Sequence, residues 1–202
     1  IKLRPLILFG LLFTAVVFFL NFYMENRLKP VLKTYAEAKS LSFATLAIND
    51  AVCGFLEQEN LAYTDLTMIE YGENGTISNI KTDIVALNQL KARLSNVIVS
   101  EMENLSRSEI KIPLGTLLGG EVFYGKGPDI RVKLVPVGGV RTDISNKFTA
   151  AGINQTRHQI LFTVSASVYI VLPSETIERT VESEFFLAET VIVGQIPDVY
   201  VN

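Results

Sequence analysis

Residues 5–23, PLILFGLLFTAVVFFLNFY, form an apolar run without a charged side chain. As a helix rising 1.5 Å per residue, this run extends over roughly 28 Å, about the thickness of the hydrocarbon core of a bilayer. A cleaved signal peptide would have a shorter apolar core and small residues at its exit, whereas this run ends in the bulky residues Leu20 to Met24. We therefore predict one transmembrane helix, with residues 1–25 as the N-terminal membrane anchor.

The charges that flank the run predict its orientation. Lys2 and Arg4 precede it, and basic residues beside a membrane span tend to remain in the cytoplasm. We expect a single-pass membrane protein with its N-terminus in the cytoplasm. The rest of the chain is then an extracytoplasmic domain.

Composition excludes several functions for the part beyond the anchor. The chain has 18 Lys and Arg against 21 Asp and Glu; without Lys2, Arg4 and Glu25, 16 basic and 20 acidic side chains remain. Nucleic-acid binding needs a clustered basic surface, so no nucleic-acid partner is expected. One cysteine and one histidine cannot form a zinc site, and we predict no metal and no cofactor. Cys53, within an apolar pattern, is expected to be a small buried side chain.

Residues 26–108 are predicted to form a helix–hairpin–helix region. Apolar residues recur at helical spacing over residues 26–58, and Pro30 suits the first turn of a helix or a kink just after the membrane. Asn74-Gly75 is typical of a two-residue hairpin turn, and it would pair Ile69 with Ile80 and Tyr71 with Ser78.

A second helix is expected behind the hairpin. Asp83 is placed to cap its N-terminus, and the helix should run to about Leu105. One face of it is apolar, formed by Leu87, Leu90, Leu94, Val97, Ile98, Met102 and Leu105.

Residues 109–202 are predicted to be an antiparallel β-rich region that shares one core with residues 26–108. Expected strands cover residues 110–113, 130–135, 140–148, 159–172 and 177–193. In the fourth strand, alternate residues should share one apolar face: Ile160, Phe162, Val164, Ala166, Val168 and Ile170. The fold class is therefore α+β, with one transmembrane helix before the domain.

The glycines between Ile112 and Pro128 predict a shaped loop. Phosphate-binding loops need a glycine motif that opens a helix, but a strand is expected after this stretch. The glycines are better explained by turns with positive φ, and such a loop could recognise a partner or a polymer. The predicted interaction surface combines this loop with a second polar stretch: Gly115, Gly119, Gly120, Gly125, Gly127, Pro128, Asn154, Gln155 and His158.

His158 is the one histidine of the chain. A general base needs an orienting group and a nearby nucleophile, and the neighbouring sequence offers neither. We expect His158 to bond Asn154 or the backbone of the loop that enters the long strand. Glu178, Glu182 and Glu184 lie at even spacing, which is typical of a solvated strand face; the alternative is an acid/base pair of a glycan hydrolase.

Four phrases occur in order between Ile110 and Asn202: IKIPLGTLLGG, GKGPDIRVKLVPVG, AGINQTRH and AETVIVGQIPDVYVN. Together with the N-terminal anchor and the helical region, they resemble the sporulation protein YunB family of endospore-forming Firmicutes. The resemblance implies a protein that is made during sporulation, is held in a membrane around the developing spore and helps build a normal spore. It implies no catalytic or ligand-binding residue.

Two functions from different classes follow as expectations. The first is a non-enzymatic, membrane-anchored protein that supports the spore envelope through contacts with other envelope proteins or with further copies of itself. The order helix-strand-strand-helix-strand, which could form a small sheet covered by two helices, is similar to ring-building modules of secretion-type and sporulation assemblies. The alternative is an enzyme or binding module of the cortex peptidoglycan, which would need His158 and a carboxylate to converge in a deep cleft.

Overall fold

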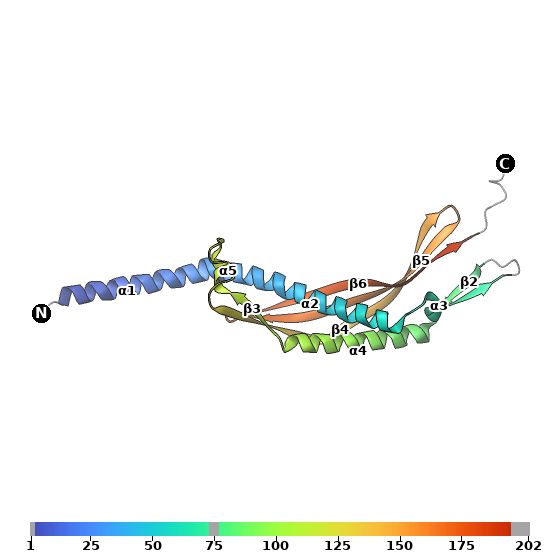
Figure 1. Cartoon of the computed structure of the whole chain (residues 1–202), viewed down its shortest axis with the longest axis horizontal. Coiled ribbons are helices and arrows are strands. Elements are labelled where there is room, and N and C mark those ends of the chain that lie inside the picture. The colour runs from blue at the N-terminus through green and yellow to red at the C-terminus, as the bar shows by residue number, and fades with distance from the viewer. Residues whose placement is uncertain (1–2, 73–76, 195–202) are drawn as a thin grey trace.

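The apolar run belongs to a continuous series of helical segments that leads into the domain and that we call the helical line (Figure 1). The computed structural model describes residues 3–72 and 77–194. Helix α1 covers Leu3–Tyr23, a π-helical turn η1 covers Met24–Leu28, and helix α2 covers Lys29–Glu59. Within this line, one helix is long and apolar enough to cross a membrane, and none of its most apolar window is buried by the protein. The predicted apolar helix is therefore present.

The π-turn explains how the line continues past Pro30. Proline has no N–H and clashes with the carbonyl four residues earlier, so an α-helix is disrupted at this point. Here the Lys29 N–H donates to the Met24 carbonyl, five residues back, and Pro30 lies in the first turn of α2. The wider turn lets the helix resume beyond the proline. As Figure 1 shows, α1 and α2 then follow one line with only a shallow bend.

A separate two-stranded ribbon follows the short helix α3 (Tyr63–Leu66). Strands β1 (Thr67–Tyr71) and β2 (Ile77–Thr82) pair antiparallel, and Ile69 lies opposite Ile80 as predicted. Tyr71 pairs with Ile77 instead of Ser78, because the register shifts between Glu70 and Tyr71. The predicted Asn74-Gly75 turn lies outside the described residues.

Helix α4 (Ile84–Ser106) has the predicted cap and the predicted face. The Asp83 carboxylate accepts from the N–H groups of Val85 and Ala86, both at 3.0 Å, which satisfies two donors at the helix start. Its buried face consists of Leu87, Leu90, Leu94, Ile98 and Met102.

Four antiparallel strands form the main sheet in the order β3-β4-β5-β6. They cover Glu109–Pro113, Asp129–Gly152, Gln155–Val171 and Thr176–Val193. The expected strands 130–135 and 140–148 are in fact one long strand, β4. Val137 lies opposite Ser167 and Arg141 opposite Ser165, so the chain between them bulges instead of turning, and Gly138 supplies a positive φ of 68° there.

Helices α2 and α4 pack on one face of this sheet. The face of β5 that they cover is the predicted one, Ile160, Phe162, Val164, Ala166, Val168 and Ile170, with at most 2% of each residue exposed. One core cluster joins them to both helices, to β3 and β4, and to Leu28 of η1. The two-layer core is thus built from segments before and after residue 108.

Two expectations about the helical region are wrong. Strand β3 pairs with β4, and β1–β2 forms its own sheet, so helix-strand-strand-helix-strand does not make one small sheet covered by two helices. Cys53 is exposed, because the buried face of α2 passes through Ala51, Val52 and Phe55 and leaves Cys53 turned away from it.

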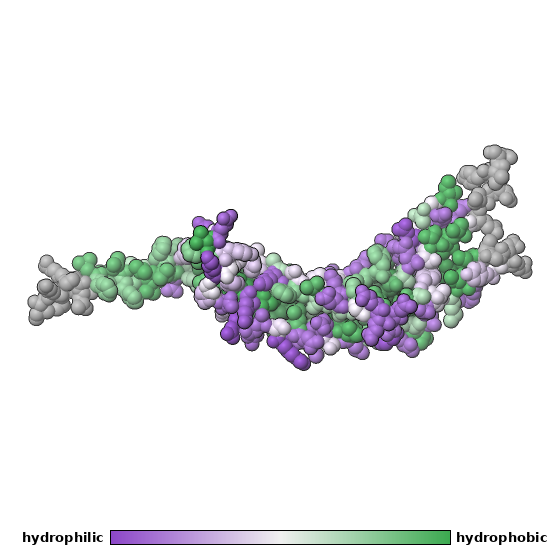
Figure 2. All heavy atoms as spheres, in the orientation of Figure 1, coloured by the Kyte–Doolittle hydropathy of each residue, from purple (hydrophilic) through white to green (hydrophobic). Residues whose placement is uncertain are grey.

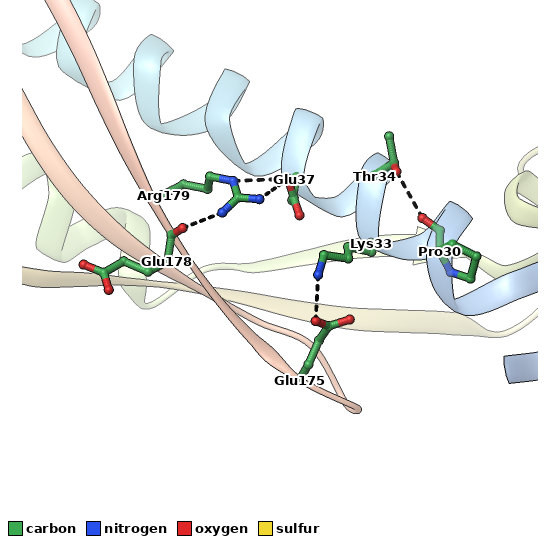
Figure 3. Close-up of polar contacts among 7 residues, drawn as sticks. All are labelled: Pro30, Lys33, Thr34, Glu37, Glu175, Glu178 and Arg179. Carbon is green, nitrogen blue, oxygen red and sulfur yellow. Dashed lines mark hydrogen bonds and ion pairs between the residues drawn. The ribbon is translucent and has the colours of Figure 1, made fainter. Parts of the chain in front are cut away.

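Polar contacts fix the first part of α2 to the β5–β6 turn (Figure 3). Lys33 Nζ lies 2.9 Å from Glu175 Oε2, and Arg179 donates from two nitrogens to Glu37 Oε2 at 2.9 and 3.2 Å. Exposed pairs of this kind contribute only about 0–1 kcal/mol each. These pairs matter for position. They hold one end of the sheet, where β6 begins, close to the start of α2 and to η1.

Candidate functional site

The predicted interaction surface is divided between two ends of the domain. The glycine loop connects α5 (Leu114–Leu118) to β4 and is level with the junction of α1 and α2 along the long axis of the molecule (Figure 1). Asn154, Gln155 and His158 belong to the start of β5 and the β4–β5 hairpin, at the end remote from α1. About twenty strand residues of β4, on the order of 60 Å at 3.3 Å per residue, separate the two regions. They cannot form one surface.

The glycine loop has a closed base. The Leu114 N–H donates to the Pro128 carbonyl at 2.9 Å, and the Gly115 N–H donates to the Lys126 carbonyl at 2.8 Å. A Cβ on Gly115 would overlap the Phe123 carbonyl oxygen and lie 2.5 Å from that of Lys126. Only glycine therefore permits the two sides of the loop to approach this closely.

Positive φ values shape the rest of the loop. Gly119 has φ 75° and Gly127 has φ 95°, and Gly120 and Gly125 share this sign. These values give the turns that the sequence indicates, and Pro128 follows at the start of β4. The helix α5 within IPLGTLL was not predicted, because five residues are too few to show helical periodicity.

The loop also exposes a cluster that the glycine pattern did not indicate. Leu118, Val122, Phe123 and Tyr124 are 44%, 70%, 56% and 67% exposed. Large apolar side chains gathered on one loop are a common mark of an interaction site. Three of them, Val122 to Tyr124, appear in the sequence as VFY between Gly119-Gly120 and the glycines at positions 125 and 127.

His158 is buried, with 1% of the residue exposed. Its ring stacks on Phe148, with ring centres 4.2 Å apart, and meets Tyr63 edge-on. Nδ1 lies 2.5 Å from the Tyr63 hydroxyl, and Nε2 lies 3.0 Å from Asn146 Oδ1. The expected bond to Asn154 or the loop backbone is therefore wrong. Strand pairing places Phe148 opposite His158, and α3 brings Tyr63 from a distant part of the sequence.

These contacts suit a neutral imidazole. Asn146 Oδ1 accepts, so Nε2 carries the proton and donates, while Nδ1 accepts from the Tyr63 hydroxyl. Burial lowers the pKa of His158 and raises the pKa of Tyr63, and both changes favour the uncharged form. A phenol and an amide hold the ring, and neither can act as the carboxylate of a catalytic triad.

Asn154 and Gln155 shape the hairpin between β4 and β5. Asn154 has φ 57°, and its carbonyl accepts from the Gly194 N–H at 2.7 Å. Gln155 lies opposite Val193 of β6. Beyond the helices, this part of the sheet exposes Ile153, Val191 and Val193 at 84%, 44% and 61%. Phe148 is also exposed, but it lies opposite His158 and therefore on the other face of the sheet from Val191 and Val193. We call Ile153, Val191 and Val193 the distal apolar surface; Figure 2 shows hydrophobic atoms along this end of the molecule.

A cleft of about 640 Å³ lies near His158 between α4, β2 and β4. Asn146 lines the cleft, but the His158 imidazole is buried and is not part of the cleft wall. Asp143 in its wall lies 3.6 Å from Lys91, and the Asp143 side chain is 76% exposed. Within residues 3–72 and 77–194, no three His, Cys, Asp or Glu side chains are grouped so that they could hold a metal ion. Glu178, Glu182 and Glu184 are all exposed on β6, as a solvated strand face should be.

The fold defines a class of protein: an elongated α+β domain of antiparallel strands, preceded by one long apolar helix. Residues 109–199 match the family model described as Sporulation protein YunB (Spo_YunB). The chain is 25% identical to "Sporulation protein YunB" of Bacillus subtilis (strain 168), and the matched region covers 98% of this chain and 84% of that relative. The resemblance to the sporulation protein YunB family is thereby confirmed. No solved structure matches the chain.

Proposed function

We propose that the chain is a single-pass, membrane-anchored sporulation protein whose extracytoplasmic domain supports a normal spore envelope by non-enzymatic protein–protein contacts. The match to the sporulation protein YunB family supports the process. The continuous line from α1 into α2 supports the anchor and carries the proposal. It joins a helix long and apolar enough to span a bilayer directly to the core of the domain.

The distal apolar surface supports contact with other proteins. Large apolar side chains exposed to water at the tip of a protein are unfavourable, and a partner that covers them gains the free energy of their burial. Ile153, at 84% exposure, lies at the far end from α1 and is the most exposed of the set. Other envelope proteins or a second copy of this chain are the partners that we propose for it.

Burial of His158 supports a non-enzymatic role. The cell-wall enzyme alternative required His158 and a carboxylate to converge in a cleft. Instead Tyr63, Asn146 and Phe148 surround the ring, and the cleft wall contributes the one carboxylate Asp143, whereas glycan hydrolysis uses a pair.

Cys53 offers a test of topology in the unmodified chain, since it is the one cysteine and is exposed on α2. Protoplasts that express the full chain are treated with a membrane-impermeant maleimide. We expect Cys53 to be labelled equally before and after permeabilisation, and Cys53→Ser to remain unlabelled. Labelling that requires permeabilisation would place the domain in the cytoplasm and contradict the proposal.

Ile153→Asp tests the distal apolar surface. We expect this variant to reduce spore formation while its membrane level and melting temperature match those of the unmodified protein. Leu46→Asp is the matched control, because Leu46 is 54% exposed on the outer side of α2 and receives the same change. Normal sporulation with Ile153→Asp, or an equal defect with Leu46→Asp, would contradict a specific contact at the tip.

A further inference from the structure

We propose that the loop Leu118–Tyr124 is a second membrane-contact site, whose apolar side chains enter the interfacial layer of the bilayer that holds α1. This inference rests on the proposed anchor and goes beyond it, since the anchor alone would involve only the N-terminal helix. The occupant that we assign to the loop is a lipid surface. A second copy of the chain or another protein is an outcome of the test.

Strand register places the loop at the level of η1. Lys133 lies opposite Val171, four residues before Glu175. Glu175 in turn forms the ion pair with Lys33 in the second turn of α2. Asp129, where the loop ends, is four strand residues before Lys133, or about 13 Å farther toward α1. The loop therefore lies near the level of the start of α2, and in Figure 1 α5 and the loop are level with the junction of α1 and α2.

The same level is where a bilayer interface would lie. The apolar run ends at Tyr23, and η1 and the first residue of α2 bring the first charges, Glu25, Arg27 and Lys29. Hydrocarbon core thus gives way to headgroups over η1. Aromatic side chains are enriched at this depth in membrane proteins, and Phe123 and Tyr124 lie at this depth.

The composition of the loop fits a lipid interface. Of the seven residues Leu118–Tyr124, four are large and apolar, two are glycine, and Glu121 alone is charged. The apolar surface of α1 continues to the same level, where Phe22 and Met24 are 60% and 48% exposed. This continuity with α1 favours lipid over a separate protein partner as the occupant. In Figure 2, the part that projects upward at this level carries a group of hydrophobic atoms beside hydrophilic ones.

The loop is held in shape before any contact. Its base is closed by the Leu114–Pro128 and Gly115–Lys126 hydrogen bonds, and the Gly125 N–H donates to Thr116 Oγ1 at 3.3 Å. A preformed loop loses less conformational entropy when it binds. Two contacts, helix and loop, would also resist tilting of the domain about η1.

The chain contains no tryptophan, so single tryptophans report on local contact with lipid. Three full-length variants are reconstituted at low protein-to-lipid ratio in phosphatidylcholine/phosphatidylglycerol vesicles with or without bromine on the acyl chains. Tyr124→Trp probes the loop. Tyr71→Trp is the matched control, because Tyr71 is 66% exposed against 67% for Tyr124 and lies on the distal ribbon. Phe22→Trp probes the anchor.

We expect brominated lipid to quench Phe22→Trp and Tyr124→Trp to a comparable fraction, and Tyr71→Trp not at all. If Tyr124→Trp is as insensitive as Tyr71→Trp while Phe22→Trp is quenched, the anchor stands and the loop contact is refuted. A blue-shifted Tyr124→Trp emission without quenching would show a protein contact, with a second copy as the occupant, and would also refute it. An unquenched Phe22→Trp would overturn the anchor and the inference together.

Discussion

Replacing His158 by alanine should lower the free energy of unfolding by about 2–4 kcal/mol. The change removes two side-chain hydrogen bonds, to Tyr63 and Asn146, each contributing about 0.5–1.5 kcal/mol. It also removes the stacked contact with Phe148, which contributes about 0.5–1.5 kcal/mol for a ring pair. Because the ring is almost completely buried, the cavity left behind adds to the loss.

Urea unfolding of the full chain in detergent, followed by far-ultraviolet circular dichroism, measures this effect. We expect a lower midpoint with an unchanged slope, because a loss of stability alone leaves the surface exposed on unfolding the same. Glu182→Ala is the control for an exposed side chain and should change the free energy of unfolding by less than about 0.5 kcal/mol.

The outcome separates a structural histidine from a catalytic one. An unchanged midpoint for His158→Ala would refute the packing argument. If that stable variant also abolished spore formation at normal protein level, the cell-wall enzyme alternative would gain direct support. A destabilised variant whose sporulation defect disappears at lower growth temperature would instead confirm that His158 acts through folding.

Three further predictions concern stability. Burial lowers the pKa of His158 from its ordinary 6.5, so as the pH falls the unfolded state takes up a proton before the folded state does. The free energy of unfolding of the unmodified protein should therefore decrease below about pH 6.5, by up to about 1.4 kcal/mol per pH unit. In urea unfolding below this pH, the difference in stability between the unmodified protein and His158→Gln should become smaller. Gly115→Ala should cost about 1–3 kcal/mol through overlap with the loop backbone, measured as melting temperature, whereas Gly139→Ala, with open space around its Cβ, should not. Asp83→Ala should cost about 1 kcal/mol by removing the α4 cap; no change in urea midpoint would refute that role.

Elements set by local pattern could be predicted from the sequence. The apolar run, the capped helix behind Asp83 and the buried alternation along β5 depend on residues that are neighbours in the chain. The Ile69–Ile80 pair was likewise fixed by a short connection. In each case the periodicity of one segment contains the information.

Contacts between distant segments could not be predicted. Tyr63 and His158 are 95 residues apart, and no local pattern links them. Two separate strands were expected over residues 130–135 and 140–148, but pairing with the long strand β5 continues through the two glycines between them as a bulge. Cys53 shows the limit of apolar pattern on a helix, since a shift of one residue from Val52 turns the side chain out of the buried face.

The candidate site shows the same division. The glycines predicted a shaped loop, and their φ values depend on adjacent residues. The grouping with Asn154, Gln155 and His158 required three-dimensional proximity, which strand β4 prevents by separating the two ends of the sheet. Sequence order placed the VFY cluster near the glycines, but only strand register and the contacts of α2 with the β5–β6 turn place it near the level of η1.

The way α1 enters the domain has a mechanical consequence for the proposed function. If α1 spans a bilayer, α2 continues it for 31 residues, about 45 Å at 1.5 Å per residue. Ion pairs from Lys33 and Glu37 fix the sheet beside the start of α2, and Leu28 joins the core, so no flexible linker separates span and domain. The distal apolar surface would then be held at a set distance from the membrane and in a set orientation. A contact that depends on such a distance suits a protein that bridges layers of an envelope better than one that searches for a soluble substrate.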